Sequence, residues 1–289
     1  MRLHIPAAAL VLIIALVAVR HHSHASLDPG HSRQGRVAST AWTPISTPAA
    51  GDSSGLAACA QDLPNGQAPS YDNVSIAPQL HVLCYQAFVV GHFAPTRTPL
   101  WSAEFLTPER IRAARQQRRV NVFHPDPQLS PNERAELSDY VRSGYDRGHL
   151  SPSGDQPSPA SQAESFTLAN MAPQNPGLNR GPWEELESSV RNLAANRPVY
   201  VITGVRFVGA QIAFLKNRVG IPTTYYKLVY DPASRAATVF EAANQEGGTP
   251  QGYAVSDFER VSGIHFGLGD VTLLSLPGSS PSPYRGGAE

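Results

Sequence analysis

The chain is poor in cysteine: only Cys59 and Cys84 occur among its 289 residues. Two cysteines alone cannot build a structural zinc site. The sequence also lacks the H-E-x-x-H pattern of zinc proteases, the P-loop of nucleoside triphosphatases and the glycine-rich fingerprint of dinucleotide-binding enzymes. These absences remove several common kinds of enzyme from consideration.

An excess of charge of either sign is also absent, because 23 lysine and arginine residues balance 23 aspartate and glutamate residues. Proteins that hold nucleic acid over a broad surface are usually basic. The bulk charge therefore does not support nucleic-acid binding. It does not exclude it either, since an enzyme that releases its product needs positive charge only locally, in a cleft.

Long apolar runs are missing except near the N-terminus, where residues 7–19 are all apolar. Arg2 precedes this run and residues 23–25 (Ser-His-Ala) resemble a small-x-small cleavage site, so residues 1–25 are interpreted as an export signal peptide. An uncleaved anchor is the alternative, but the run is short for a span of ~20 residues. We therefore expect an exported protein, periplasmic or extracellular, with no stable membrane association once processed and membrane-anchored only if the signal is not cleaved.

Composition divides the rest of the chain into three parts. Residues 26–56 are rich in small and polar residues and in proline, which predicts a flexible linker. Residues 57–276 form a block long enough for one mixed domain, and residues 277–289 are predicted to be a disordered tail. In an exported protein the even cysteine count suggests one disulfide, Cys59–Cys84, which would stabilise the fold by about 3 kcal/mol.

Hydrophobic periodicity and turn signals predict the secondary structure of this domain. Strands are predicted over residues 81–92, 98–105, 164–171, 199–207, 224–230 and 236–242. Helices are predicted from Thr107 toward Arg119, within residues 131–142, and over residues 181–195 and 255–261. Because strands and helices alternate irregularly, the fold class is predicted to be α+β rather than a doubly wound sheet.

The first predicted helix is dense in arginine. Thr107 is suited to the N-cap, Pro108 to the first turn and Glu109 to an early position that favours acids. The arginines that follow are Arg110, Arg112, Arg115, Arg118 and Arg119. A solvated helical face and a patch that faces phosphate groups both explain them, and the sequence does not decide between the two.

The segment Asp146-Arg147-Gly148-His149 places an arginine and a histidine two positions apart. If the segment is extended, Arg147 and His149 lie on the same face, because side chains alternate along a strand. The imidazole can take a proton from water, and the guanidinium can stabilise charge on a phosphate. Gly148 lets backbone or substrate approach closely. Alone this segment is a weak signal, since a surface histidine near an arginine is more often incidental.

A second cluster follows, with Asn170 and Gln174 first, then Asn179 just before the helix predicted over residues 181–195 and Glu187 within it. Asn179 would cap that helix if its role were only structural. Glu187 lies about 12 Å further along the axis, but side chains lean toward the helix N-terminus, so it can hold the water shell of an ion bound at Asn179. Mg²⁺ suits such a site because it keeps several waters and needs few protein ligands. Otherwise Glu187 is a solvated carboxylate.

Together the two segments resemble the DNA/RNA non-specific endonucleases of the ββα-metal (His-Me finger) superfamily, the group of Serratia-type nucleases and endonuclease G-like enzymes. The resemblance rests on Asp-Arg-Gly-His, then Asn-x-x-Pro-Gln, then Leu-Asn-x-x-x-Trp-x-x-Leu-Glu, and extends over residues 59–266. It implies an α+β fold with a mixed, mainly antiparallel sheet flanked by helices.

The resemblance also implies a role for each matched residue. His149 matches the family's general base and Arg147 an arginine that contacts phosphate. Asn179 matches the only direct protein ligand of a Mg²⁺ ion, for which Mn²⁺ can substitute. Glu187 matches a carboxylate that acts on the metal through water.

Three further assignments come from the same resemblance. Asn170 and Gln174 match polar residues that line the site, the first near the chemistry and the second near the substrate. The family has an upstream arginine that stabilises the transition state, for which Arg119 is the candidate and Arg118, otherwise a substrate-binding residue, the rival.

The implied function is that of an exported, metal-dependent endonuclease that hydrolyses the phosphodiester bonds of DNA and RNA to 5′-phosphate products, whatever the sugar. Two alternatives are an inactive nucleic-acid-binding module on the same fold and a phosphodiesterase that acts on small substrates. DNA and RNA are the expected partners. A homodimer and a protein inhibitor are left open by the sequence.

Overall fold

The structure, a computed structural model, describes residues 56–276. The predicted signal peptide, the tail and all of the predicted linker except Leu56 lie outside the described residues. Within residues 56–276 no helix is long and apolar enough to span a membrane.

A large sheet forms the centre of the described region, with strand order β12-β11-β10-β7-β4-β3-β2 and β14 added beside β11. All of its pairs are antiparallel except the short pairing of β11 with β14. Its strands are β2 (Leu80–Cys84), β3 (Val89–Phe93), β4 (Thr98–Leu106), β7 (Val199–Arg206), β10 (Thr224–Asp231), β11 (Ala236–Ala243), β12 (Gln251–Tyr253) and β14 (Thr272–Leu273).

Three small two-stranded sheets surround the large one. They pair β5 (Asp146–His149) with β6 (Met171–Gln174), β8 (Ala213–Leu215) with β9 (Val219–Ile221), and β1 (Ser70–Tyr71) with β13 (Ile264–His265). The β5–β6 pair carries the Asp-Arg-Gly-His segment, so this segment is extended, which is the condition under which Arg147 and His149 were expected to share a face.

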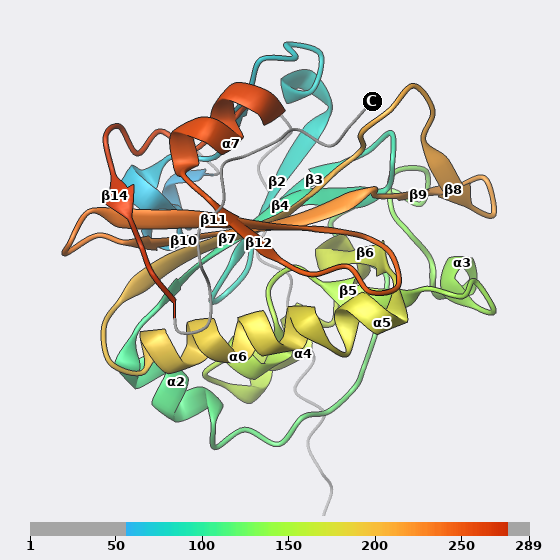
Figure 1. Cartoon of the computed structure of the whole chain (residues 1–289). Coiled ribbons are helices and arrows are strands. Elements are labelled where there is room, and N and C mark those ends of the chain that lie inside the picture. Colours follow the sequence, from blue (N-terminus) through green and yellow to red (C-terminus); the bar gives the residue numbers. More distant parts are fainter. Residues whose placement is uncertain (1–55, 277–289) are drawn as a thin grey trace, which may run out of the picture. The chain divides into compact units, whose positions relative to one another are not determined.

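Helices lie on both sides of the large sheet, with α2 and α6 on one side and α7 on the other (Figure 1). The α-helices are α2 (Pro108–Ala114), α3 (Leu137–Tyr140), α4 (Pro159–Ser165), α5 (Pro176–Asn179), α6 (Pro182–Ala194) and α7 (Val255–Ser262). Short 3₁₀ helices are η1 (Ala60–Asp62), η2 (Pro64–Gly66), η3 (Ala77–Gln79), η4 (Ser153–Asp155) and η5 (Leu168–Asn170).

Helix α6 packs its apolar face onto the sheet. Trp183, Leu186, Val190 and Ala194 recur at helical spacing and are all buried. The Trp183 ring meets that of Tyr225 on β10 edge-on, with centroids 5.6 Å apart. Burying side chains of this size stabilises the fold by roughly 1.5–3 kcal/mol each. The opposite face of α6 is left for polar residues, and it borders the pocket described below.

The predicted α+β class with a mainly antiparallel sheet is confirmed, whereas some boundaries were wrong. The predicted strand 81–92 is the hairpin β2–β3, turned where the Tyr85 amide donates to the Phe88 carbonyl. Both strands are rich in apolar residues, since β3 lies in the core and β2 packs against it, and the sequence therefore shows no break between them. Cys59 and Cys84 are joined in a disulfide.

Two other predictions fail because local signals were overridden or missed. The predicted strand 164–171 divides into the end of α4, the turn η5 and the start of β6. Helix α4 begins with a Ser158 cap and a first-turn Pro159, an N-terminal signal that the β-like residues downstream concealed. Helix α2 ends at Ala114 rather than near Arg119, and the chain beyond it is bound by α4, since the Val120 amide donates to Gln162.

Candidate active site

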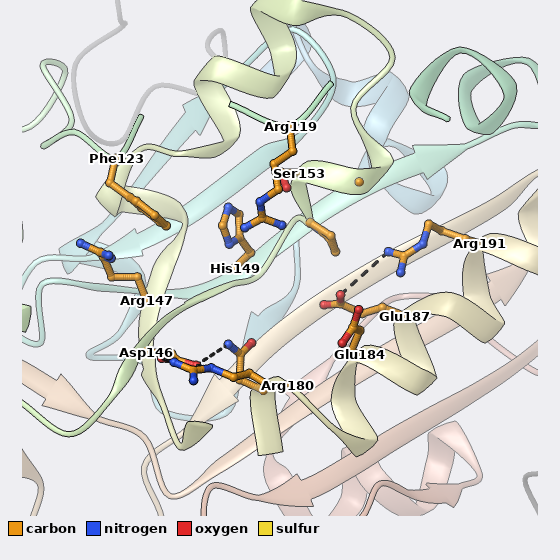
Figure 2. Close-up of a pocket in the computed structure, with 13 residues that line it drawn as sticks. Arg119, Phe123, Asp146, Arg147, His149, Ser153, Arg180, Glu184, Glu187 and Arg191 are labelled. Carbon is orange, nitrogen blue, oxygen red and sulfur yellow. Dashed lines mark hydrogen bonds and ion pairs between the residues drawn. The ribbon is translucent and has the colours of Figure 1, made fainter. Parts of the chain in front are cut away.

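A pocket of about 520 Å³ lies where β5 faces the polar side of α6. Figure 2 shows His149, Arg147 and Arg119 on one side of it and Glu184, Glu187 and Arg191 on the other. The full lining is Arg119, Phe123, Asp146, Arg147, His149, Pro152, Ser153, Gly154, Asn179, Arg180, Glu184, Glu187 and Arg191. The structure therefore brings together Arg147, His149, Asn179, Glu187 and Arg119 of the predicted site.

Gly148 allows the two strands beneath the pocket to approach each other. A Cβ atom at this position would lie 2.3 Å from the Gln174 Oε1 atom on β6, where real side chains are essentially never found. Arg147 and His149, on either side of the glycine, both reach the pocket. The glycine is therefore required by packing under the site rather than by an unusual backbone angle.

The His149 imidazole is held in its neutral form. Burial, followed by the positive charges of Arg119 and Arg147, lowers the pKa of His149 from 6.5 to about 3. Its Nε2 atom is buried and has no hydrogen-bond partner within residues 56–276. A neutral imidazole beside arginines can accept a proton at neutral pH, which is the state that a general base needs.

Asn179 is oriented by a carboxylate. Its Nδ2 atom donates to Asp146 Oδ2 at 2.8 Å, and Arg180 binds the same carboxylate at 2.8 and 2.5 Å. Because an ionised carboxylate only accepts hydrogen bonds, the amino end of the Asn179 amide must face Asp146. The Oδ1 atom is thus left for another partner, such as a cation. The alternative role for Asn179, the cap of α6, falls instead to Gly181.

Helix α6 presents two carboxylates to the pocket, Glu184 and Glu187, which lie one turn apart. Glu187 is largely buried and lies 3.9 Å from Arg191 Nη1, which also contacts Asp155 at 3.2 Å. Burial raises the pKa of Glu187 to about 7, and the nearby charges of Lys227 and Arg191 oppose that rise. A cation in the pocket would favour the ionised form further.

The oxygen atoms of Asn179, Glu184 and Glu187 are the groups that could hold a metal. Within the described part of the chain no three His, Cys, Asp or Glu side chains form a ligand cluster. An amide oxygen with nearby carboxylates fits a hydrated Mg²⁺, which needs few direct protein ligands. It does not fit zinc, which prefers nitrogen and sulfur ligands.

Asn170 and Gln174 do not line the pocket, contrary to the prediction. Both are fully buried beneath it. The Asn170 amide accepts from the Ser151 amide and donates to the carbonyls of Ser151 and Ser165, each at 2.9 Å, and so holds the segment that follows His149. Gln174 packs under Gly148, and its side-chain amide has no partner within residues 56–276. The motif spacing indicated correctly that these residues lie near the site. It could not show whether their side chains line the pocket or hold the backbone that surrounds it.

The structure separates the two upstream arginines. Arg119 lines the pocket, its Nε atom donates to Asn121 at 2.7 Å, and its guanidinium lies over the Phe166 ring, 5.3 Å from the centroid. Arg118 is exposed and does not line the pocket. Arg110 is largely buried against Glu104, at 2.8 Å, and is therefore structural. The geometry favours Arg119 as the arginine nearest the chemistry.

Several pocket residues escaped the sequence analysis. Arg191 could have been found, because it lies four positions after Glu187 on a helix. Asp146 was quoted only as part of its motif, although it orients Asn179. Phe123 gave no signal, because an isolated aromatic residue in a loop has no periodic pattern.

Comparison with known proteins now identifies the family. The family model for DNA/RNA non-specific endonuclease matches residues 67–269, a range that contains every residue of the pocket. The chain belongs to this family.

Its relatives among characterised proteins share about a third of the aligned residues. The mitochondrial nuclease EXOG of Danio rerio is 33% identical over 209 residues, covering 63% of this chain and 59% of that protein. Endonuclease G of Homo sapiens, also mitochondrial, is 35% identical over 161 residues, 52% of each chain. The mitochondrial nuclease of Saccharomyces cerevisiae is 31% identical over 166 residues, with 52% and 50% covered. The chain thus spans between half and three fifths of the length of these relatives.

A solved structure confirms the ββα-metal fold. A chain from the complex titled EndoG/EndoGI, on the mechanism of EndoG inhibition, superposes with a TM-score of 0.58 at 28% identity and covers 64% of this chain and 85% of that one. In this chain two short paired strands, β5 and β6, are followed by the helices α5 and α6.

The expected location is wrong. The sequence predicted a periplasmic or extracellular protein, whereas the named relatives above are mitochondrial nucleases. The export prediction depended on residues 1–25 alone, which lie outside the described residues. The family match covers residues 67–269 and does not include that segment.

Proposed function

We propose that this endonuclease-family chain hydrolyses phosphodiester bonds of both DNA and RNA in a metal-dependent reaction that leaves 5′-phosphate products. The observation that supports this most strongly is the composition of one pocket, where a neutral imidazole, four guanidinium groups and a cation-accepting amide oxygen face one another. Guanidinium groups bind phosphate oxygens in a bidentate manner, and contacts to the phosphate backbone carry no sequence information, so such contacts account for cleavage without sequence preference.

In the proposed mechanism His149 is the general base. Its neutral imidazole takes a proton from the water that attacks phosphorus. Arg147 and Arg119, on the same side of the pocket, bind the phosphate and stabilise the negative charge that grows on it. Asn170 supports the segment after His149 from below.

Asn179 is the proposed direct ligand of the metal, through the Oδ1 atom that Asp146 leaves free. Glu187, and Glu184 beside it, would hold the water shell. When bound there, Mg²⁺ or Mn²⁺ supplies Lewis-acid stabilisation of the phosphate and of the leaving 3′-oxygen. Glu187 keeps its carboxylate in place through Arg191, which is itself anchored on Asp155.

The domain boundaries and partners stay proposals as well. Residues 57–276 are proposed as the catalytic domain. The structural relative was solved in a complex on EndoG inhibition, and we propose a protein inhibitor as a partner class for this chain. A homodimer stays a prediction.

Purified protein is expected to convert supercoiled plasmid and single-stranded RNA to fragments when Mg²⁺ is present. Cleavage of both substrates should stop when a chelator removes the metal. Product ends should accept label from a kinase only after phosphatase treatment, because they carry 5′-phosphate. Nucleic acid that is bound in a gel-shift assay but never cut, with Mg²⁺ or Mn²⁺, would indicate an inactive binding module. Hydrolysis of bis(4-nitrophenyl) phosphate without cleavage of polymers would indicate a small-substrate phosphodiesterase.

The arginine strip formed by Arg115 and Arg118 is proposed to contact phosphates beside the scissile one. Both side chains are exposed, and Arg115 contacts Asn192, the neighbour of the pocket residue Arg191, at 3.4 Å. Since Arg119 lines the pocket, residues 115–118 lead directly to it along the chain. The strip thus supplies the local positive charge that the neutral chain as a whole lacks.

Arg118→Gln is expected to weaken cleavage of long DNA severalfold at physiological salt and to reduce the slope of log(kcat/KM) against log[salt] by about one, because one phosphate contact is lost. The measurement is kcat/KM for a duplex between low and moderate salt. Arg260→Gln, on α7 at the other side of the sheet and similarly exposed, is the matched control. An equal salt slope for the two variants would remove Arg118 from the substrate path.

A further inference from the structure

The orientation of His149 raises a problem that the proposed mechanism does not solve. General bases are usually aimed by a hydrogen bond from the second ring nitrogen to a carboxylate or carbonyl group. No such bond is present for the His149 imidazole within residues 56–276, and its Nε2 atom is buried without a partner. Packing must therefore hold the ring.

Two phenylalanine rings, Phe123 and Phe166, provide that packing. The Phe166 ring meets the His149 ring edge-on, with centroids 5.0 Å apart and planes at 85°. The Phe123 ring lies 5.8 Å from His149 and is tilted by 56°. The two phenylalanines meet each other at 5.0 Å and 89°. Two of the three ring contacts are edge-to-face, an arrangement that aromatic pairs prefer, and the third is tilted; together they restrain rotation of the imidazole.

The same two rings carry the two arginines of the site. The Arg147 guanidinium stacks on Phe123, 4.0 Å from the ring centroid, and the Arg119 guanidinium lies over Phe166 at 5.3 Å. Figure 2 shows Phe123 beside Arg147, and the Arg119 guanidinium beside His149. Each phenylalanine therefore contacts the imidazole and one guanidinium at once.

Backbone pairing fixes the rings relative to each other. His124, the residue after Phe123, forms a parallel bridge with Thr167, the residue after Phe166. The His124 amide donates to the Phe166 carbonyl at 3.3 Å, and the Leu168 amide donates to the His124 carbonyl at 2.8 Å. Phe166 itself is fully buried. The two rings come from segments far apart in the sequence, yet they are joined as one unit.

We propose that Phe123 and Phe166 form an aromatic bracket that positions the general base and both phosphate-binding arginines in a single arrangement. The bracket does for His149 what a hydrogen-bonded carboxylate or carbonyl does for other catalytic histidines. The roles of the three held residues rest on the proposed function, whereas the bracket concerns how they are held. Both phenylalanines are positioning residues, since neither needs to touch the reacting atoms.

Phe123 is the better residue to change, because it borders the pocket and is only partly buried, so its loss removes less of the core. Phe123→Leu is expected to lower kcat by about tenfold to 100-fold, the range that a small misplacement of catalytic groups costs. Phe123→Tyr keeps the ring and should restore most of the activity. Phe105→Leu is the matched control, because Phe105 is also partly buried and stacks on another ring, Tyr200, at 4.4 Å.

The decisive measurement is the NMR titration of the His149 imidazole in the free protein. Burial and the facing charges of Arg119 and Arg147 lower the pKa of His149 to about 3. Opening the bracket admits water, which stabilises the charged form, so the midpoint in Phe123→Leu should move upward toward 6.5, and the ring signals should broaden or shift. Phe123→Tyr and Phe105→Leu should keep the low midpoint.

The bracket is overturned if Phe123→Leu leaves the His149 titration and signals unchanged, whatever happens to activity. It is also overturned if Phe105→Leu produces the same upward movement, because the effect would then be general loosening. A wild-type protein that cuts no nucleic acid would refute the proposed function, and the titration would still decide the bracket.

Discussion

His149→Ala is expected to lower kcat for DNA cleavage by about 10²–10⁴-fold, the contribution typical of general acid–base catalysis. The attacking water then has no imidazole beside it, and the neighbouring guanidinium groups of Arg119 and Arg147 donate hydrogen bonds but have no acceptor atom. DNA binding should change little, because the guanidinium groups remain.

Plasmid nicking over a range of plasmid concentrations measures kcat, and a gel shift in chelator measures binding. His81→Ala is the matched control: this histidine lies on β2, pairs with Glu133 at 3.3 Å and is absent from the pocket lining. A rate for His149→Ala within a few-fold of the wild type would remove the imidazole from the mechanism.

Asn179→Ala is expected to lower activity at low Mg²⁺ by at least about 100-fold, because the proposed direct ligand is lost. Residues that only support a metal ligand typically change metal affinity or activity by about 10–100-fold already. Activity should recover in part as the metal concentration rises, since Glu187 and Glu184 remain. Binding of Mn²⁺, followed by electron paramagnetic resonance without substrate, should weaken in parallel.

Asp146→Ala tests the same proposed metal site through the residue that orients Asn179. Asn179 then keeps its oxygen but loses the carboxylate that fixes the direction of its amide, so an intermediate loss of about 10–100-fold in metal affinity is expected. Asn196→Ala, an exposed asparagine past the end of α6, is the control. Mn²⁺ affinity that is unchanged in Asn179→Ala would place the metal elsewhere.

The contrast between Arg119 and Arg118 shows where sequence reasoning stops. Neighbouring arginines in the chain carry the same chemistry, and the motif spacing upstream of β5 does not choose between them. Only the path of residues 115–124 across α4 decides that Arg119 reaches the pocket and Arg118 faces solvent. Long-range contacts of this kind leave no periodic signal.

Asn170 and Gln174 show a related limit. Their positions in the motif indicate closeness to the site, and both do lie beneath it. Whether an amide faces substrate or holds the backbone depends on which side of β6 and η5 is covered, and that is set by packing. The amide direction of Asn179 is likewise set by Asp146, a residue 33 positions earlier.

By itself the amino-acid sequence determined the α+β class and the amphipathic helix α6 with Glu187 on its polar face, because these follow from local periodicity and from residue chemistry at short spacing. Tertiary structure alone decided which arginine enters the pocket, which amides support it from below, and that Phe123 and Phe166 enclose the imidazole. Those features arise from contacts between segments far apart in the chain, where burial and charge depend on every neighbour at once.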